Sequence, residues 1–243
     1  MLSTDGKTHN KTDSEKNRLQ QVYKERDVRM PPTDRFRNKY HPRHPLGRLF
    51  HEHSRYILLT ALNKLEIELD NMHILDVGCG HGYWLRFLVE LGSSPANLVG
   101  VDLSEQRIKI AKERNPGLNW LCNDGQTLPF LSETFDITMQ TAVFSSILNE
   151  KLRKMLADEM LRVTKPEGMI IWCDHKRSFS KTLTGFSKSG VVEYFHGSSV
   201  AYARYVYPFY FRLFYRQLGW LWPVIYHLTS FFCESLFLVI RKK

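Results

Sequence analysis

The sequence contains little that would place the protein outside the reducing interior of a cell. Its four cysteines lie far apart and form no Cys-x-x-Cys pair, so they indicate neither a disulfide framework nor a zinc ribbon. The segment MLSTDGKTHNKTDSEKN, residues 1–17, has no apolar run of the kind that directs secretion. We therefore predict a cytoplasmic protein with free thiols.

Metal-binding patterns are missing as well. Cys79 and His81 lie close together, but a metal site would need two further donors at matched spacing, and no second Cys/His pair is present. The histidine-rich segment HPRHPLGRLFHEH lacks the H-E-x-x-H spacing of a zinc-binding helix. We predict no metal site and expect these histidines to lie on the surface or to line a pocket.

The charge of the chain is modestly basic, at +9 over 243 residues. Residues 1–47 carry much of it, with eleven Lys or Arg against six Asp or Glu. Nucleic-acid binding is one interpretation of such an excess. The basic residues are interspersed with acids and no nucleic-acid motif accompanies them, so we favour a solvated basic arm and expect no nucleic-acid partner.

Three segments follow one another along the chain. Residues 1–14 are polar and are predicted to form a disordered basic tail. Residues 15–69 contain two amphipathic helical patterns separated by a proline-rich stretch, and are predicted to form an N-terminal helical cover. From residue 70 to residue 243, short apolar strands alternate with helical stretches, which is typical of βαβ units. We predict an α/β, doubly wound Rossmann-like domain.

The C-terminal part of the chain is dense in aromatic residues, and no Asp, Glu, Lys or Arg occurs from Gln217 to Cys233. This stretch contains Gly219, Pro223 and His227 and is shorter than the roughly twenty apolar residues of a membrane helix, so we do not expect it to span a membrane. Two interpretations stay open for residues 205–230: an aromatic lid over an apolar pocket, or a peripheral contact with the inner face of the membrane.

The strongest motif is HILDVGCGHG, residues 73–82, in which an apolar strand leads into three glycines at every second position. In a doubly wound sheet this turn faces the ligand, and glycine lets the ligand approach the main chain. The dinucleotide pattern G-x-G-x-x-G would require glycine at position 83, which is Tyr83. An acid, Asp76, precedes the first glycine by two positions. A carboxylate there would repel a pyrophosphate and attract a cation such as S-adenosylmethionine.

On these residues the chain resembles the class I S-adenosylmethionine-dependent methyltransferases of the broad type 11 group. LDVGCGHG is similar to the first motif of that family, and VGVDLS, LNWLCNDGQTLPF and EMLRVTKPEGMIIWCD are similar to later ones, with Glu167-Gly168 where Gly-Gly is more usual. The resemblance extends over roughly residues 45–243. It implies a seven-stranded sheet whose last strand, SLFLVIRKK, is antiparallel, with S-adenosyl-L-methionine as the cofactor.

The resemblance also implies which residues bind the cofactor. Asp102 ends the second strand, where the family binds both ribose hydroxyls, and a carboxylate has the lone pairs for a vicinal diol. Asp124 stands where an acid or amide accepts from the adenine amine. The full set of expected cofactor-binding residues is Asp76, Gly78, Cys79, Gly80, Gly82, Asp102, Leu103, Asn123, Asp124, Gly125 and Gln140.

Methyl transfer to a hydroxyl would profit from a general base. WCDH ends the fifth predicted strand, so we expect Asp174 and His175 at the ligand edge of the sheet, with the imidazole as the proton acceptor. Glu52, His53 and Arg55 of the N-terminal cover are competing candidates. QTAVF follows the fourth strand where the family's amino-methylating DNA enzymes carry an Asn-Pro-Pro-Tyr type sequence, which argues against nucleic-acid acceptors.

The acceptor is the least defined part of this hypothesis. The whole-chain likeness resembles bacterial methyltransferases of glycan biosynthesis, which favours O-methylation of a sugar, a glycan or a lipid-linked glycan precursor. Alternatives are another small molecule, such as an isoprenoid quinone, a lipid or a natural product, and a degenerate methyltransferase fold that binds a partner without catalysis. The sequence does not indicate the oligomeric state.

Overall fold

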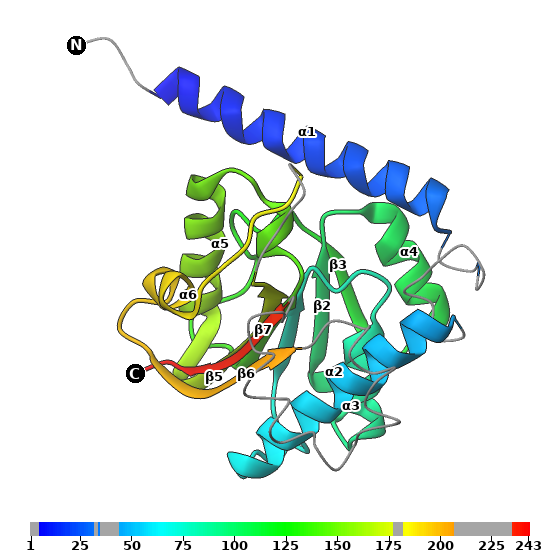
Figure 1. Cartoon of the computed structure of the whole chain (residues 1–243), viewed down its shortest axis with the longest axis vertical. Coiled ribbons are helices and arrows are strands. Elements are labelled where there is room, and N and C mark those ends of the chain that lie inside the picture. Colours follow the sequence, from blue (N-terminus) through cyan, green and yellow to red (C-terminus); the bar gives the residue numbers. More distant parts are fainter. Residues whose placement is uncertain (1–4, 32–33, 35–43, 177–181, 207–234) are drawn as a thin grey trace, which may run out of the picture.

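The computed structural model describes most of the chain and forms one sheet with helices on both faces (Figure 1). The residues described are 5–31, 34, 44–176, 182–206 and 235–243. The helices are α1 (Asp5–Arg29), α2 (Pro45–Lys64), α3 (Tyr83–Glu90), α4 (Glu105–Arg114), α5 (Glu150–Val163) and α6 (Lys188–Tyr194). The strands are β1 (Ile74–Val77), β2 (Leu98–Asp102), β3 (Asn119–Cys122), β4 (Phe135–Thr141), β5 (Thr164–His175), β6 (Ser199–Val206) and β7 (Ser235–Arg241).

The seven strands lie in the order β3-β2-β1-β4-β5-β7-β6. The first five pair in parallel, and β7 inserts antiparallel between β5 and β6. This confirms the α/β doubly wound fold and the antiparallel last strand. The order reverses between β1 and β4, and at such a switch point the loops after neighbouring strands diverge and leave a crevice for a ligand.

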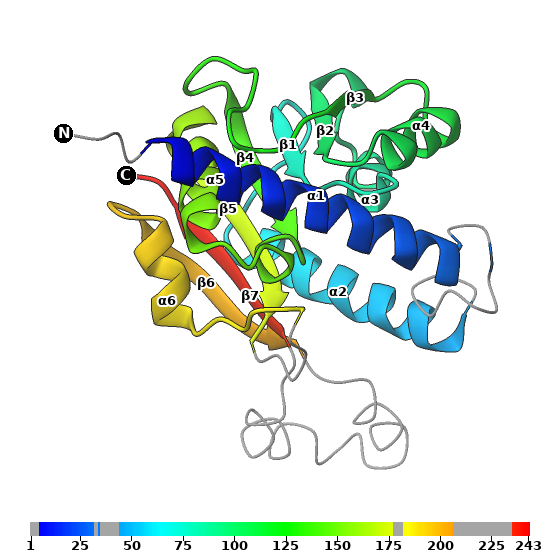
Figure 2. The ribbon, with the colours of Figure 1, turned by 90° about the horizontal axis from the view of Figure 1, so that it is seen from above.

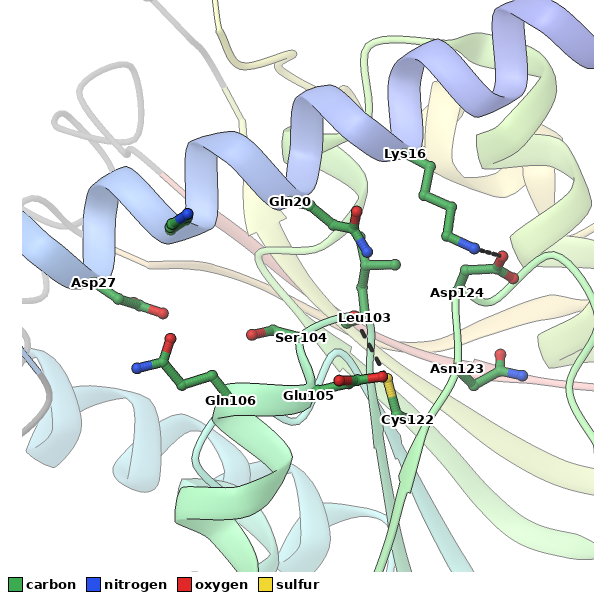
Figure 3. A pocket seen from close by; sticks show the side chains of 11 residues that line it. Lys16, Gln20, Asp27, Leu103, Ser104, Glu105, Gln106, Cys122, Asn123 and Asp124 are labelled. Atoms are coloured by element: carbon green, nitrogen blue, oxygen red, sulfur yellow. Dashed lines mark hydrogen bonds and ion pairs between the residues drawn. The ribbon is translucent and has the colours of Figure 1, made fainter.

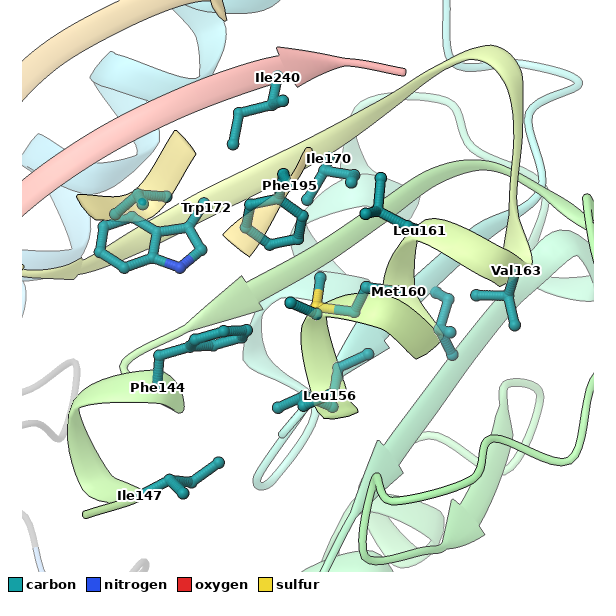
Figure 4. Packing of buried hydrophobic residues seen from close by; sticks show 14 of the residues in the cluster. Phe144, Ile147, Leu156, Met160, Leu161, Val163, Ile170, Trp172, Phe195 and Ile240 are labelled. Atoms are coloured by element: carbon teal, nitrogen blue, oxygen red, sulfur yellow. The ribbon is translucent and has the colours of Figure 1, made fainter. Parts of the chain in front are cut away.

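The central strands β1, β2, β4 and β5 send alternate side chains into two separate apolar cores, because successive residues of a strand point to opposite faces. On β5, Ile170 and Trp172 pack into the core under α5 and α6, while Ile171 packs into the core under α2, α3 and α4. Figure 4 shows the first core, in which Trp172 faces Phe144 and Phe195. Both faces of the central strands are therefore dry, which fixes the register of the strand ends that carry the polar residues.

Helix α1 departs from the expected N-terminal arrangement. It begins at Asp5, so ten residues of the segment expected to be a disordered tail are helical. The helix lies across the carboxyl ends of the strands (Figures 1 and 2). Polar side chains contact the loops there, and Leu19 is buried in the core. Tertiary contacts thus anchor the helical pattern that was predicted from residue 15 onward.

Two further elements bear on the C-terminal expectations. Strand β6 was not predicted from the sequence, although its exposure alternates along most of its length as expected for an edge strand. The aromatic segment expected to form a lid over residues 205–230 lies almost entirely outside the described residues. Among the helices that the structure describes, none has the length and apolar character needed to cross a membrane.

Candidate functional site

Most backbone N–H groups of the glycine loop between β1 and α3 donate hydrogen bonds to acceptors within the protein. The N–H groups of Gly78 and Cys79 both donate to the carbonyl of Val101, at 2.8 and 3.0 Å, and Gly82 donates to the carbonyl of Cys79 at 2.9 Å. The Gly80 N–H donates to Oδ2 of Asp102 at 2.9 Å. A phosphate-binding loop needs free N–H groups directed at the ligand. Four amides of this loop are engaged within the protein, so the loop is poorly suited to a pyrophosphate.

Two glycines of the loop serve different purposes. Gly80 has φ +55°, and a Cβ built on it would meet no atom within 4 Å, so its Cα faces open space that a ligand can approach. Gly82 has φ +75°, and a Cβ there would overlap the indole ring of Trp120. Gly80 therefore fits the expected cofactor contact, whereas Gly82 permits close packing of α3 against β3.

Asp76 at the end of β1 is buried without a partner. Its side chain is 1% exposed, and neither carboxylate oxygen has a hydrogen-bond partner among the described residues. Burial, and then the charge of Asp102, raise the pKa of this carboxyl well above its ordinary value. A buried carboxylate of this kind is stabilised by a cation. The ammonium group of S-adenosylmethionine is such a cation, so the donor set here fits this cofactor.

Asp102 at the end of β2 links the glycine loop to α4. One oxygen accepts from Gly80 N and the other from Ser104 N, each at 2.9 Å. Burial raises its pKa, while the charge of Arg107 and these two bonds act in the opposite direction. An ionised carboxylate has about four lone-pair sites, so two remain for a ribose diol. Ser104 caps α4, as its Oγ accepts from Arg107 N at 3.4 Å.

The expected adenine-side residues form a tight turn after β3. Oδ1 of Asn123 accepts from Gly125 N at 2.7 Å, and its amide donates to the carbonyl of Thr127. The carboxylate of Asp124 binds Lys16 of α1 at 2.8 Å (Figure 3). In this structure Asp124 therefore contacts the covering helix, a contact that the sequence did not indicate.

These residues surround a small cavity, the inner cavity, of about 140 Å³. Six of the expected cofactor residues line it: Gly78, Asp102, Leu103, Asn123, Asp124 and Gly125. Three side chains of α1 complete the wall: Leu19, Tyr23 and Arg26. None of these three residues was predicted from the sequence, although their spacing of four and three residues places them on one helix face. A wider pocket of about 600 Å³ lies next to the inner cavity, between α1 and the ends of β2 and β3 (Figure 3). It is also lined by Leu103, Asn123 and Asp124.

A second cavity, the broad cavity, has a volume of about 470 Å³ and lies beyond the ends of β4 and β5. His175, Asp174 and Cys79 line it, together with His51 and Ser54 of α2. The competing candidates on that helix are placed elsewhere, since none of them is among its lining residues. Arg55 instead donates to the hydroxyl of Tyr83 at 2.9 Å. The inner and broad cavities share four wall residues: Arg26, Gly78, Thr141 and Ala142.

The two expected catalytic residues differ in their surroundings. Asp174 is 2% exposed, and its oxygens accept from the backbone N–H of Ser145 at 3.0 Å and of His175 at 2.8 Å. Burial raises the pKa of Asp174. Its carboxylate therefore fastens the turn after β4 to the end of β5. The His175 ring is half-buried at the edge of the broad cavity, where it can meet a ligand.

Gln140 is fully buried and lines neither cavity, whereas His81 lines the broad cavity. Oε1 of Gln140 accepts from Val143 N at 3.0 Å, so this side chain shapes the turn after β4. Burial, and then the charge of Arg107, lower the pKa of His81 to about 4, which keeps its imidazole neutral at pH 7. Within the described part of the chain, no group of three or more His, Cys, Asp or Glu side chains could hold a metal ion.

Comparison with known proteins agrees with this geometry. Residues 74–168 match the family model of a methyltransferase domain. A phthiotriol/phenolphthiotriol dimycocerosates methyltransferase of Mycobacterium tuberculosis is 34% identical over 121 residues, which are 49% of this chain and 43% of that protein. The match therefore spans less than half the length of that relative.

Solved structures share the fold at low sequence identity. The PH0226 protein of Pyrococcus horikoshii superposes with a TM-score of 0.63 at 16% identity, covering 92% of this chain and 99% of its own. An S-adenosylmethionine-dependent methyltransferase of Mesorhizobium loti gives a TM-score of 0.55 at 15% identity, covering 75% of this chain and 96% of its own. These neighbours show that the chain has the fold of such proteins.

Proposed function

We propose that the protein transfers a methyl group from S-adenosylmethionine to a hydroxyl oxygen of a small-molecule or glycan acceptor. The observation that carries this proposal is the common wall of the two cavities at the ends of β1 and β4. The inner cavity presents the acids expected to bind the nucleoside, and the broad cavity presents His175. A donor in one cavity and an acceptor in the other would meet at Thr141 and Ala142.

The residues of the chain would contribute positioning and one proton transfer. The cofactor, when bound, supplies an electrophilic methyl group on a sulfonium. Asp76 and Asp102 would hold its ammonium and ribose ends, and alignment of two reactants can contribute roughly 7–11 kcal/mol to a barrier reduction. His175 would accept the hydroxyl proton as oxygen attacks, a contribution of typically about 10²–10⁴-fold. Asp174 is a positioning residue in this scheme, because it fixes the backbone of His175.

Sugar, glycan or lipid-linked glycan precursors stay the first acceptor candidates in this proposal. Tyr83 and Trp84 line the broad cavity beside polar groups, and such walls suit stacking on sugar rings. The lipid substrate named for the mycobacterial relative makes a lipid hydroxyl the second candidate. The broad cavity supports both, since Val22, Met30 and Val206 add apolar surface.

Calorimetry with S-adenosylhomocysteine tests the cofactor site. The wild-type protein is expected to bind it with a micromolar Kd, and Asp102→Asn should weaken binding at least tenfold, because the amide cannot accept from both ribose hydroxyls and both backbone N–H groups. Asp158→Asn, at an exposed acid on α5, is the matched control. Thermal melting of each variant shows whether it is folded.

The possible results separate the hypotheses. Unaltered binding by the Asp102 variant would contradict the assigned cofactor site. A folded wild-type protein that does not bind S-adenosylhomocysteine would favour the alternative of a methyltransferase fold that binds a partner without catalysis.

A further inference from the structure

One face of α1 supplies positive charge to the broad cavity. Five α1 and adjoining residues line this cavity: Arg18, Val22, Arg26, Arg29 and Met30. The spacing of four, four and three residues places Arg18, Val22, Arg26 and Arg29 on one side of the helix, and Met30 follows the end of the helix. Three of the five are arginines, and their planar guanidinium groups carry fixed donors.

The three arginines differ in how their charge is balanced. Arg18 donates to both oxygens of Glu15, at 2.7 and 2.8 Å, and is neutralised. Within the part of the chain that the structure describes, Arg26 and Arg29 form no ion pair with an acid. The guanidinium group of Arg26 lies over the ring of Tyr23, 5.1 Å from the ring centroid. Two unneutralised guanidinium groups therefore border the broad cavity.

Nearby acids do not compensate these two charges. Asp27, next to Arg26 on the helix, binds Arg107 at 2.8 and 3.0 Å. Glu25 accepts from Gln21 at 2.8 Å and is exposed. Asp174 is the acid that lines the broad cavity, and its oxygens are taken by two backbone N–H groups. The cavity thus carries an excess of positive charge at the α1 side.

We infer that the acceptor carries an anionic group, a phosphate or a carboxylate, which Arg26 and Arg29 bind at the α1 side of the broad cavity. The inference rests on the proposed function, because it specifies the acceptor of the same site. Guanidinium groups three residues apart on a helix face the same way, and each can bind a phosphate or carboxylate through two parallel N–H bonds. The anion would hold the acceptor at one end, with its hydroxyl toward His175.

The carboxylate of the cofactor is the competing ligand for Arg26, because this residue also lines the inner cavity. Arg29 lines the broad cavity and not the inner one. The test is therefore made on protein saturated with S-adenosylhomocysteine, whose own carboxylate is then already bound.

Three sugar probes of matched size test the inference: glucose, glucuronate and glucose 6-phosphate. Each is titrated into the full chain saturated with S-adenosylhomocysteine at constant ionic strength, and binding is measured by saturation-transfer NMR. We expect at least one anionic probe to bind at least fivefold more tightly than glucose. The glucuronate and phosphate arms show which anion the site takes.

Charge-matched variants locate the anion site. Arg26→Gln with Arg29→Gln should abolish the preference for the anionic probe. Lys109→Gln with Lys112→Gln, at two exposed positions of α4, removes the same charge elsewhere and should leave the preference unchanged. Replacement of both arginines by Lys keeps the charge but removes the paired N–H donors of the guanidinium group. This variant should give an intermediate preference for the anionic probe.

Several results would overturn the inference. These are glucose binding as tightly as the anionic probes, no probe binding at all, or a preference that survives in the Arg26→Gln, Arg29→Gln protein. A double variant that loses tenfold in S-adenosylhomocysteine affinity but keeps the preference would assign both arginines to the cofactor. In each of these cases the proposed function is still supported if the wild-type protein binds S-adenosylhomocysteine. If the wild-type protein does not bind S-adenosylhomocysteine, the result contradicts the proposed function and does not bear on the anion site.

Discussion

Asp27 of α1 and Arg107 of α4 form a bidentate ion pair, with Arg107 Nη2 and Nε lying 2.8 and 3.0 Å from the two carboxylate oxygens. Both side chains are largely buried, at 13% and 11% exposure. The pair joins the covering helix to the helix that follows Asp102, and the Arg107 guanidinium stacks on the ring of Tyr23 at 4.4 Å. It is thus a structural connection between the cover and the cofactor side of the sheet.

Loss of this pair should loosen α1. We expect Asp27→Asn to lower the free energy of unfolding by about 1–3 kcal/mol, because charge-assisted hydrogen bonds to a largely buried guanidinium are lost. Urea unfolding followed by far-UV circular dichroism measures this change. Glu25→Gln on the same helix is the control and should change the free energy by less than about 0.5 kcal/mol. An Asp27 variant as stable as this control would show that the pair does not anchor the helix.

Asp76 should show a conflict between stability and binding. Asp76→Asn is expected to stabilise the ligand-free protein at pH 7 by about 1–3 kcal/mol, because an unpartnered buried carboxylate is replaced by a neutral amide. The same change should weaken S-adenosylhomocysteine binding, since a cation loses its counter-charge. Chemical denaturation and calorimetry on one preparation measure the two effects. A destabilised variant would indicate that Asp76 has a partner in the free protein.

The stability gain from Asp76→Asn should depend on pH. Burial raises the pKa of Asp76 in the folded state above that in the unfolded chain. Protonated Asp76 therefore adds to the free energy of unfolding below the ordinary carboxyl pKa, and this contribution is lost as pH rises through the pKa of the folded state. The difference between variant and wild type should therefore grow from pH 5 to pH 8 in the ligand-free protein. Saturating S-adenosylhomocysteine should reduce this difference, because the ligand pairs with the charge.

His81 should show the opposite pH dependence. Its pKa of about 4 lies below the ordinary histidine value, so protonation favours the unfolded chain. Its contribution to stability is present above pH 6.5 and is lost as pH falls from 6.5 toward 4, by up to about 3 kcal/mol. NMR titration of the His81 ring should give an apparent pKa near 4. His81→Gln should remove this acid sensitivity, whereas His73→Gln, at an exposed position, should not.

Substitutions at two neighbouring residues of the turn within β5, Glu167 and Gly168, should have opposite effects on stability. Glu167 adopts φ +59°, which costs a non-glycine residue about 1–2 kcal/mol, so Glu167→Gly should raise the free energy of unfolding by about 0.5–1 kcal/mol. Gly168→Ala should lower it by about 1–3 kcal/mol, because the added Cβ would lie 2.8 Å from the carbonyl oxygen of Lys165. Thermal and urea unfolding of both variants test this ordering. Equal effects would contradict the assigned strain.

Much of the fold could be predicted because its signals are local. The buried strands β1, β2 and β4 are short apolar runs bounded by turn residues, and Ser104 caps α4 as its position directly before Glu105 and a polar helix indicates. The first ten residues of α1 and the edge strand β6 were not predicted. The stability of α1 and β6 comes from partners far along the chain, such as Ser146, whose carbonyl accepts from Arg18 at 2.6 Å.

The glycine loop, the acids at the ends of β1 and β2 and the expected class of cofactor follow from the sequence alone, because each of these residues stands at a recognisable strand end or in the turn that follows it. That α1 completes the inner cavity and brings Arg26 and Arg29 to the broad one is visible only in the folded molecule. A charged helix face does not indicate which part of the chain it will contact. Ion pairs such as Lys16 with Asp124, 108 residues apart, exist only once the sheet has formed.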